Sequence, residues 1–115
     1  MASKKQLELM ASLYKRNFDP LETLRILKTK PTWLWSWGFR NAGIVKDKLL
    51  LFRVSGHYHK GYIAITLNWD DTYIVSLINV RWEVKETIEN VYVDELLDLL
   101  DTKIERKAEY DLTVK

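Results

Sequence analysis

The chain contains no cysteine, and this absence removes several kinds of chemistry at once. Without thiols there is no disulfide framework, no thiolate zinc site and no cysteine nucleophile. The lack of cysteine also fits the reducing cytoplasm, where we expect the protein to reside. Only two prolines and four glycines interrupt the 115 residues, and no linker or repeat divides them. We therefore expect one domain over residues 1–115, with frayed ends at 1–3 and 108–115. Alternatively, residues 110–114 add an edge strand.

A long apolar run is also missing. The N-terminal segment carries charges among its apolar residues, unlike a signal peptide, and no stretch approaches the roughly 18 apolar residues of a membrane span. Hydrophobic residues nevertheless make up 47% of the chain and charged residues 30%, which is enough apolar content for a folded core. These proportions predict a soluble, globular protein that does not bind membranes.

The sequence has none of the common catalytic motifs. Its glycines, at positions 38, 43, 56 and 61, match neither a dinucleotide-binding nor a phosphate-binding loop, and no G-x-S-x-G motif is present. Paired carboxylates occur at Asp70 and Asp71 and at helical spacing in Asp94, Asp98 and Asp101, a pattern typical of a solvated surface. We therefore expect no enzymatic activity and no cofactor.

Helical periodicity marks both ends of the chain. Residues 3–18 and 20–30 have apolar side chains at three- and four-residue steps, and so do residues 92–107. Asp19 and Pro20 are suited to the start of the second helix, and Pro31 forbids its continuation. Leu21, Leu24 and Leu27 are expected to form the buried side of that helix.

From Pro31 onward the apolar period changes from about 3.6 to 2, which predicts a sheet. In the stretch PTWLWSWGFR, four large aromatic side chains would point to one side of an extended strand, namely Trp33, Trp35, Trp37 and Phe39. Burial of such rings contributes several kcal/mol, so we expect this row to face the core rather than to bind a ligand. At least two of the three tryptophans should be mostly buried.

Four further segments alternate in the same way: residues 46–56, 62–68, 72–80 and 81–89. The short loop WDD at 69–71 predicts a hairpin between the second and third of them. The expected fold is α+β, with two N-terminal helices, a four- or five-stranded and mainly antiparallel sheet, and one C-terminal helix.

The opposite face of this expected sheet also carries apolar side chains, among them Leu34, Leu51, Ile74 and Ile78. Helices divided between the two faces would cover them, and so would a second copy of the chain. The first two helices are joined by a short segment and are expected to pack as one unit. That arrangement would leave these four residues as a homodimer interface.

Three segments together resemble a group of known proteins. They are TLRILK before the aromatic-rich segment, the hairpin ITLNWDDTYIV, and the entry VYVDELLDLL into the last helix. Over most of residues 23–104 the chain is similar to small uncharacterised proteins of gut-type bacteria and of their phages or mobile elements. The resemblance implies a compact α+β domain and no particular chemistry.

The segment SGHYHKG contains both histidines of the chain. In an extended conformation His57 and His59 project to the same side and could share a metal ion, with Asp70 and Asp71 as further ligands. Because a third histidine and any cysteine are missing, we instead expect an exposed loop without a metal. As a speculative binding site we take Arg40, His57, Tyr58, His59 and Lys60.

Charge is distributed unevenly along the chain. Residues 1–60 contain twelve Lys and Arg against four Asp and Glu, and the remainder contains six against twelve, giving +8 and −6 and hence the net charge of +2. Basic and aromatic residues alternate between Lys28 and Lys60, a mixture typical of single-strand nucleic-acid binders. The sequence therefore favours a non-enzymatic binding or accessory domain that acts through an unknown protein partner, with single-stranded nucleic-acid binding as the alternative.

Overall fold

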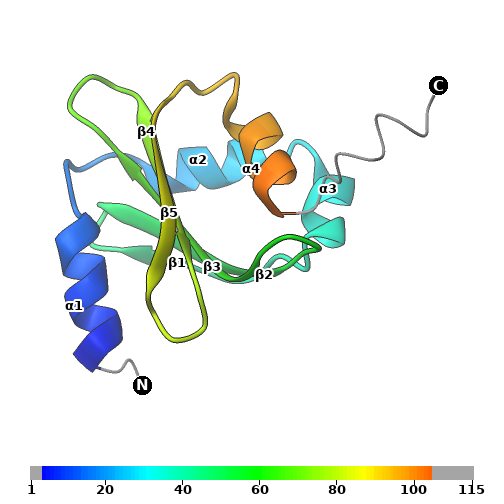
Figure 1. Ribbon diagram of the computed structural model, residues 1–115. Coiled ribbons are helices and arrows are strands. Elements are labelled where there is room, and N and C mark those ends of the chain that lie inside the picture. The colour runs from blue at the N-terminus through cyan, green and yellow to red at the C-terminus, as the bar shows by residue number, and fades with distance from the viewer. Residues whose placement is uncertain (1–3, 105–115) are drawn as a thin grey trace.

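The computed structural model of the protein describes residues 4–104 (Figure 1). These residues form four helices and five strands in the following order: α1 (Lys4–Leu13), α2 (Pro20–Leu27), α3 (Pro31–Ser36), β1 (Arg40–Val45), β2 (Leu49–Ser55), β3 (Lys60–Leu67), β4 (Tyr73–Ile78), β5 (Val84–Val91) and α4 (Leu96–Ile104). The possible strand at 110–114 and the ends expected to fray lie outside the described residues. None of the helices at 4–104 is long and apolar enough to cross a membrane.

The strands form one antiparallel sheet in the order β1-β2-β3-β4-β5, so each strand pairs with its neighbour in the chain. Short turns connect them, and residues 68–72 form the hairpin tip expected from the WDD loop. The predicted α+β fold with an antiparallel sheet and a C-terminal helix is therefore confirmed. Consecutive strands run in opposite directions, so successive turns alternate between the two ends of the sheet. The turns at 46–48 and 68–72 lie at one end, and those at 56–59 and 79–83 lie at the other.

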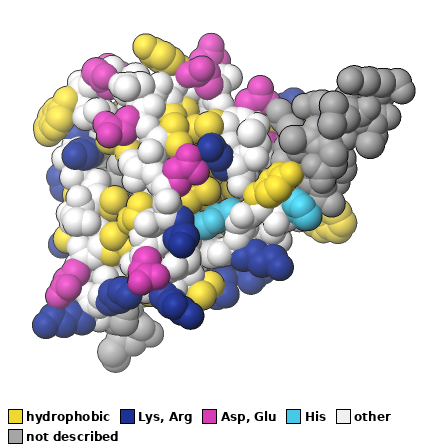
Figure 2. Space-filling view, in the orientation of Figure 1, with side chains coloured by type: hydrophobic (Ala, Val, Ile, Leu, Met, Phe, Trp, Pro, Cys, Tyr) yellow, Lys and Arg dark blue, Asp and Glu magenta, His cyan; other side chains and the backbone are white. Residues whose placement is uncertain are grey.

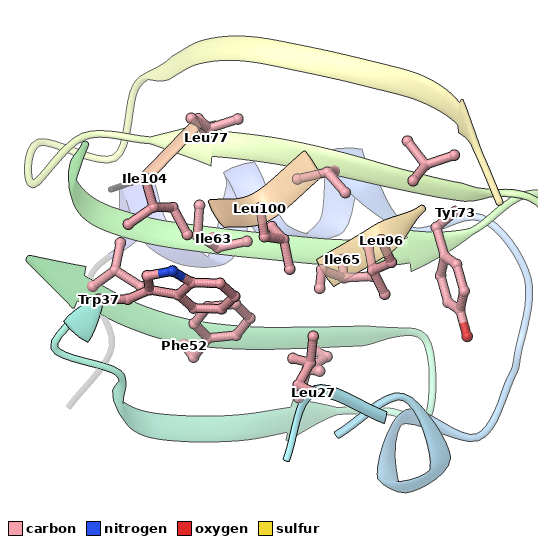
Figure 3. Packing of buried hydrophobic residues seen from close by; sticks show 14 of the residues in the cluster. Leu27, Trp37, Phe52, Ile63, Ile65, Tyr73, Leu77, Leu96, Leu100 and Ile104 are labelled. Atoms are coloured by element: carbon pink, nitrogen blue, oxygen red, sulfur yellow. The ribbon is translucent and has the colours of Figure 1, made fainter. Parts of the chain in front are cut away.

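The main core lies between one face of the sheet and the helices α2, α3 and α4 (Figures 1 and 3). In β2 the alternate residues Leu50, Phe52 and Val54 point into it, as the period of 2 predicts. From the helices come Leu27 of α2 and Leu96 and Leu100 of α4, all fully buried. This face therefore holds most of the apolar area that stabilises the fold.

The expected strand through the tryptophans is wrong, because residues 31–36 form the short helix α3. Pro31 occupies its first turn, where the missing N–H costs no hydrogen bond. In a helix of 3.6 residues per turn, Trp33 and Trp37 share a side while Trp35 points away from it. Accordingly Trp37 is fully buried, Trp33 packs against the core while partly buried, and Trp35 is 86% exposed.

The helix α1 covers the second face of the sheet. Its Met10 packs against Leu49, Ala64 and Ile78, and Leu9, Leu13 and Tyr14 border this smaller cluster. The expectation that α1 and α2 pack as one unit is therefore wrong: the two helices lie on opposite faces (Figure 1). The six-residue segment between them, residues 14–19, is long enough to pass around the sheet edge.

This division removes the open apolar face on which the homodimer was predicted. Leu34 belongs to the main core, because α3 is a helix. Ile74 and Ile78 are buried, and Leu51 is partly buried beside the α1 cluster. Leu34, Ile74 and Ile78 are thus interior residues, Leu51 is partly covered, and Leu34 does not share a face with Leu51 and Ile78.

The start of α2 follows the sequence prediction closely. Asp19 Oδ1 accepts from the backbone N–H of Leu21 at 3.1 Å and of Glu22 at 3.4 Å, and Pro20 occupies the first turn. The predicted buried side was partly wrong, since Leu21 is exposed. Thr23 is buried in its place and shares a 3.1 Å hydrogen bond with the hydroxyl group of Tyr73.

Candidate functional site

Two arginines face each other at the end of the sheet that carries the β2–β3 turn. Arg40 begins β1 and is the direct partner of Arg53 in β2. Directly opposed residues of antiparallel strands point to the same side of the sheet, so the two arginine side chains start from neighbouring positions, next to an irregularity in the β1–β2 register. Like charges in such a pair repel each other. Neither arginine forms an ion pair with another of the described residues.

An aromatic stack continues this patch across the sheet. Arg53 is paired with Tyr62 of β3, and its Cζ lies 5.5 Å from the ring centroid of the tyrosine. The other neighbour of Tyr62 is Trp82, whose ring is stacked at a centroid distance of 4.0 Å and an interplanar angle of 20°. Arg40, Arg53, Tyr62 and Trp82 are hereafter called the basic-aromatic row.

The turn between β4 and β5 holds Trp82 in place. Asn79 Oδ1 accepts from the backbone N–H of Arg81 at 2.9 Å and of Glu83 at 3.0 Å, and the Asn79 carbonyl accepts from the N–H of Trp82 at 3.0 Å. These bonds stabilise the left-handed conformation of Trp82, at φ 64°. Asn79 is therefore the positioning residue for the ring that ends the row.

One further exposed cation lies near the row. Lys60 starts β3 two residues before Tyr62 and is exposed, as is Arg40. In Figure 2, Lys and Arg side chains lie over the lower part of the view, with acidic side chains among them. The nearest carboxylate of the turn, Glu83, accepts from Asn79 Nδ2, and this hydrogen bond together with the charge of Lys5 lowers the pKa of Glu83. The lowered pKa keeps Glu83 ionised, so this turn also carries a negative charge.

The SGHYHKG segment is not the freely exposed loop that was expected. Its backbone holds the end of α4, since the N–H groups of Tyr58 and His59 donate to the carbonyl of Ile104 at 2.8 and 3.4 Å. His57 and Tyr58 are exposed and in edge-to-face contact, whereas His59 is buried and its Nε2 donates to the carbonyl of Tyr62 at 3.1 Å. The two histidines therefore do not form a pair of ligands. Of the speculative binding residues, Arg40 and Lys60 lie at the row.

Zinc and nickel are expected to leave the melting temperature of the protein unchanged. No three His, Asp or Glu side chains at residues 4–104 lie close enough together to hold a metal ion, and a site with too few ligands contributes little linkage stabilisation. Thermal unfolding followed by circular dichroism, with each metal and with a chelator, measures this. A metal-dependent rise that His57→Ala abolishes would contradict the prediction.

None of the protein-family models, curated proteins or solved structures compared with the chain matches it. The resemblance to proteins of gut-type bacteria and their phages or mobile elements therefore stays a prediction.

Proposed function

We propose that the protein is a non-enzymatic, cytoplasmic binding domain whose ligand is a single-stranded nucleic acid, bound at the basic-aromatic row. One observation carries the proposal: Arg40 and Arg53 are direct cross-strand partners, and neither has an ionic partner among the described residues. A like-charged pair in this position destabilises the sheet, typically by a fraction of a kcal/mol. A phosphate group between the two guanidinium groups would turn that repulsion into attraction, because each can donate two parallel hydrogen bonds to it.

The aromatic part of the row supports a single strand rather than a duplex as the ligand. A ring can stack only on a base that is not already stacked in a helix, and such stacking contributes about 1–3 kcal/mol per base. Trp82 is the partly exposed end of the Tyr62–Trp82 stack. Phosphate contacts at Arg40 and Arg53 and a base contact at Trp82 would together accommodate a short stretch of single strand.

A protein partner remains the second candidate. The apolar face that favoured it is covered by α1, so the case now depends on separate exposed rings, among them Trp35, whose indole is 86% exposed on α3. Separate exposed rings are a weaker reason than a pair of opposed cations. We therefore place nucleic-acid binding first.

Binding of a labelled single-stranded oligonucleotide, followed by fluorescence anisotropy at several salt concentrations, tests the proposal. We expect weak affinity, since the net charge of the chain is only +2. The affinity should fall as salt rises, because contacts to phosphates release bound counterions. Arg53→Gln should weaken binding several-fold and should make the slope of log K against log salt less steep by about 0.7, the value for one phosphate contact to a single strand. Arg40→Gln should have a similar effect.

Arg25→Gln is the matched control, because Arg25 is an exposed arginine of α2 on the other side of the sheet. It removes the same charge and should change the affinity much less. Equal losses in Arg25→Gln and Arg53→Gln would mean that only net charge matters and would overturn the proposed site. No binding even at low salt would overturn the function and favour a protein partner.

A further inference from the structure

A cleft of about 550 Å³ lies at the other end of the sheet, away from the basic-aromatic row. Three segments surround it: the residues after α1, the turn between β1 and β2, and the hairpin between β3 and β4. Its lining consists of Lys15, Arg16, Asn17, Lys48 and Trp69. The cleft therefore combines three cations, one amide and one large ring, and none of the described residues that line it is acidic.

Hydrogen bonds fix the walls of the cleft. The N–H of Phe18 donates to the carbonyl of Asp47 at 2.9 Å and ties the segment after α1 to the β1–β2 turn. In the hairpin, the N–H of Trp69 donates to Asn68 Oδ1 at 2.8 Å, and the N–H of Asn68 donates to the carbonyl of Thr72. Trp69 thus belongs to an ordered turn. This order lowers the entropic cost of binding a ligand against its ring.

The nearby carboxylates are occupied by local partners. Asp71 forms an ion pair with Arg16, and Asp70 accepts from both the N–H and the hydroxyl group of Thr72, bonds that lower the pKa of Asp70. Lys15 and Lys48, in contrast, form no ion pair with another described residue. The two ammonium groups are therefore the charges available to an anion that enters the cleft.

Trp69 itself is 74% exposed, although a buried tryptophan would stabilise the fold considerably. Its ring lines the cleft instead of the core. A planar ring at the mouth of a cationic cleft is suited to a ligand that has both a flat face and a negative charge.

We infer that this cleft is a nucleotide site, in which the base stacks on Trp69 and the phosphate is bound by Lys15 and Lys48. The depression of about 550 Å³ is largely open to solvent, so a nucleotide bound against Trp69 would stay partly exposed. The same chemistry is presented by a free nucleoside monophosphate and by one nucleotide of a longer strand. The inference depends on side chains that do not belong to the basic-aromatic row, so it can be tested independently of the proposed function.

The test follows the indole N–H signals of the five tryptophans by NMR during titration of the full chain, with Trp69→Phe identifying the signal of Trp69. Adenosine monophosphate is the probe, and adenosine and inorganic phosphate each supply one half of it. We expect the Trp69 signal to shift with the nucleotide and much less with either half. Lys48→Gln should weaken binding of the nucleotide about ten- to hundredfold, as for loss of one charged hydrogen bond.

Trp35→Phe is the matched control, since it removes an even more exposed indole on α3 and should leave the affinity unchanged. A Trp69 signal that does not move at millimolar nucleotide, or equal affinity in wild type and Lys48→Gln, would overturn the inference. The inference would also be overturned if inorganic phosphate or adenosine bound with the same affinity as the nucleotide, because one half of the ligand would then suffice.

An oligonucleotide titration distinguishes the two sources of the nucleotide. If the oligonucleotide shifts the Trp69 signal at lower concentration than the monophosphate and Arg53→Gln weakens that effect, the ligand is a strand that contacts both ends of the sheet. If the monophosphate binds at least as well, the ligand is a free nucleotide. Both results support the cleft as a nucleotide site. An oligonucleotide that binds in an Arg53-dependent way while Trp69 stays unaffected would overturn the cleft and leave the basic-aromatic row in place.

Discussion

Replacing Trp37 with alanine is expected to lower the free energy of unfolding by about 3–5 kcal/mol, the range for removal of a large buried ring. Trp37 is fully buried in the main core, near Phe52 (Figure 3), and its Nε1 donates to Asp101 Oδ1 at 2.9 Å. The substitution would therefore leave a cavity and remove a hydrogen bond that links the residue after α3 to α4. Chemical denaturation followed by circular dichroism measures the change.

Trp35→Ala is the matched control, only two residues away. Because Trp35 is 86% exposed, its removal should change the free energy of unfolding by less than about 0.5 kcal/mol. Emission spectra should agree: loss of Trp37 should remove blue-shifted emission, and loss of Trp35 should remove red-shifted emission. Equal destabilisation by the two substitutions would contradict the helical placement of the tryptophans.

Gly61→Ala is expected to destabilise the protein by roughly 2–6 kcal/mol, the sum of about 1–3 for a strained backbone and about 1–3 for overpacking. Gly61 has φ 149°, a conformation that residues with a side chain rarely adopt. In addition, a Cβ at this position would overlap the carbonyl oxygen of Ile78 in the neighbouring strand β4. The central strands would have to separate locally to make room.

Gly43→Ala provides the comparison within the same sheet. A Cβ at Gly43 would have no heavy atom within 4 Å, and the edge strand β1 is exposed there. Its free energy of unfolding should therefore stay within about 0.5 kcal/mol of the wild type. The two melting curves, recorded side by side, check both expectations, and a stable Gly61→Ala variant would show that the β3–β4 pairing tolerates a side chain at that position.

The tryptophan segment shows why part of the fold could not be predicted. Large residues at positions 33, 35 and 37 satisfy the period of 2, but positions 33 and 37 are also one helical turn apart. Over six residues these two patterns cannot be separated. Pro31 forbids the continuation of α2, and it is equally a signal for the first turn of a new helix.

The candidate site was predicted less completely than the fold. Arg40 and Lys60 were among the expected binding residues, whereas Arg53, Tyr62 and Trp82 were not. Arg40 and Arg53 are thirteen positions apart in the chain, and only the strand register makes them neighbours. The contact of Trp82 with Tyr62 depends on the left-handed turn that Asn79 stabilises, and alternation within a strand says nothing about such a turn.

The sequence by itself determined the features that arise from interactions between near neighbours in the chain. The start of α2 at Asp19, the alternation of β2 and the hairpin of β3 and β4 belong to this group, because capping, periodicity and turn formation act over a few residues. The tertiary structure decided on which face each helix packs and which distant side chains meet. Both α1 and α2 are amphipathic and could cover either apolar face of the sheet. Their division between the faces depends on how all the apolar surfaces are covered together, a property of the whole chain that no short segment contains. That division buried the expected interface, and the register of the sheet brought the two opposed arginines together.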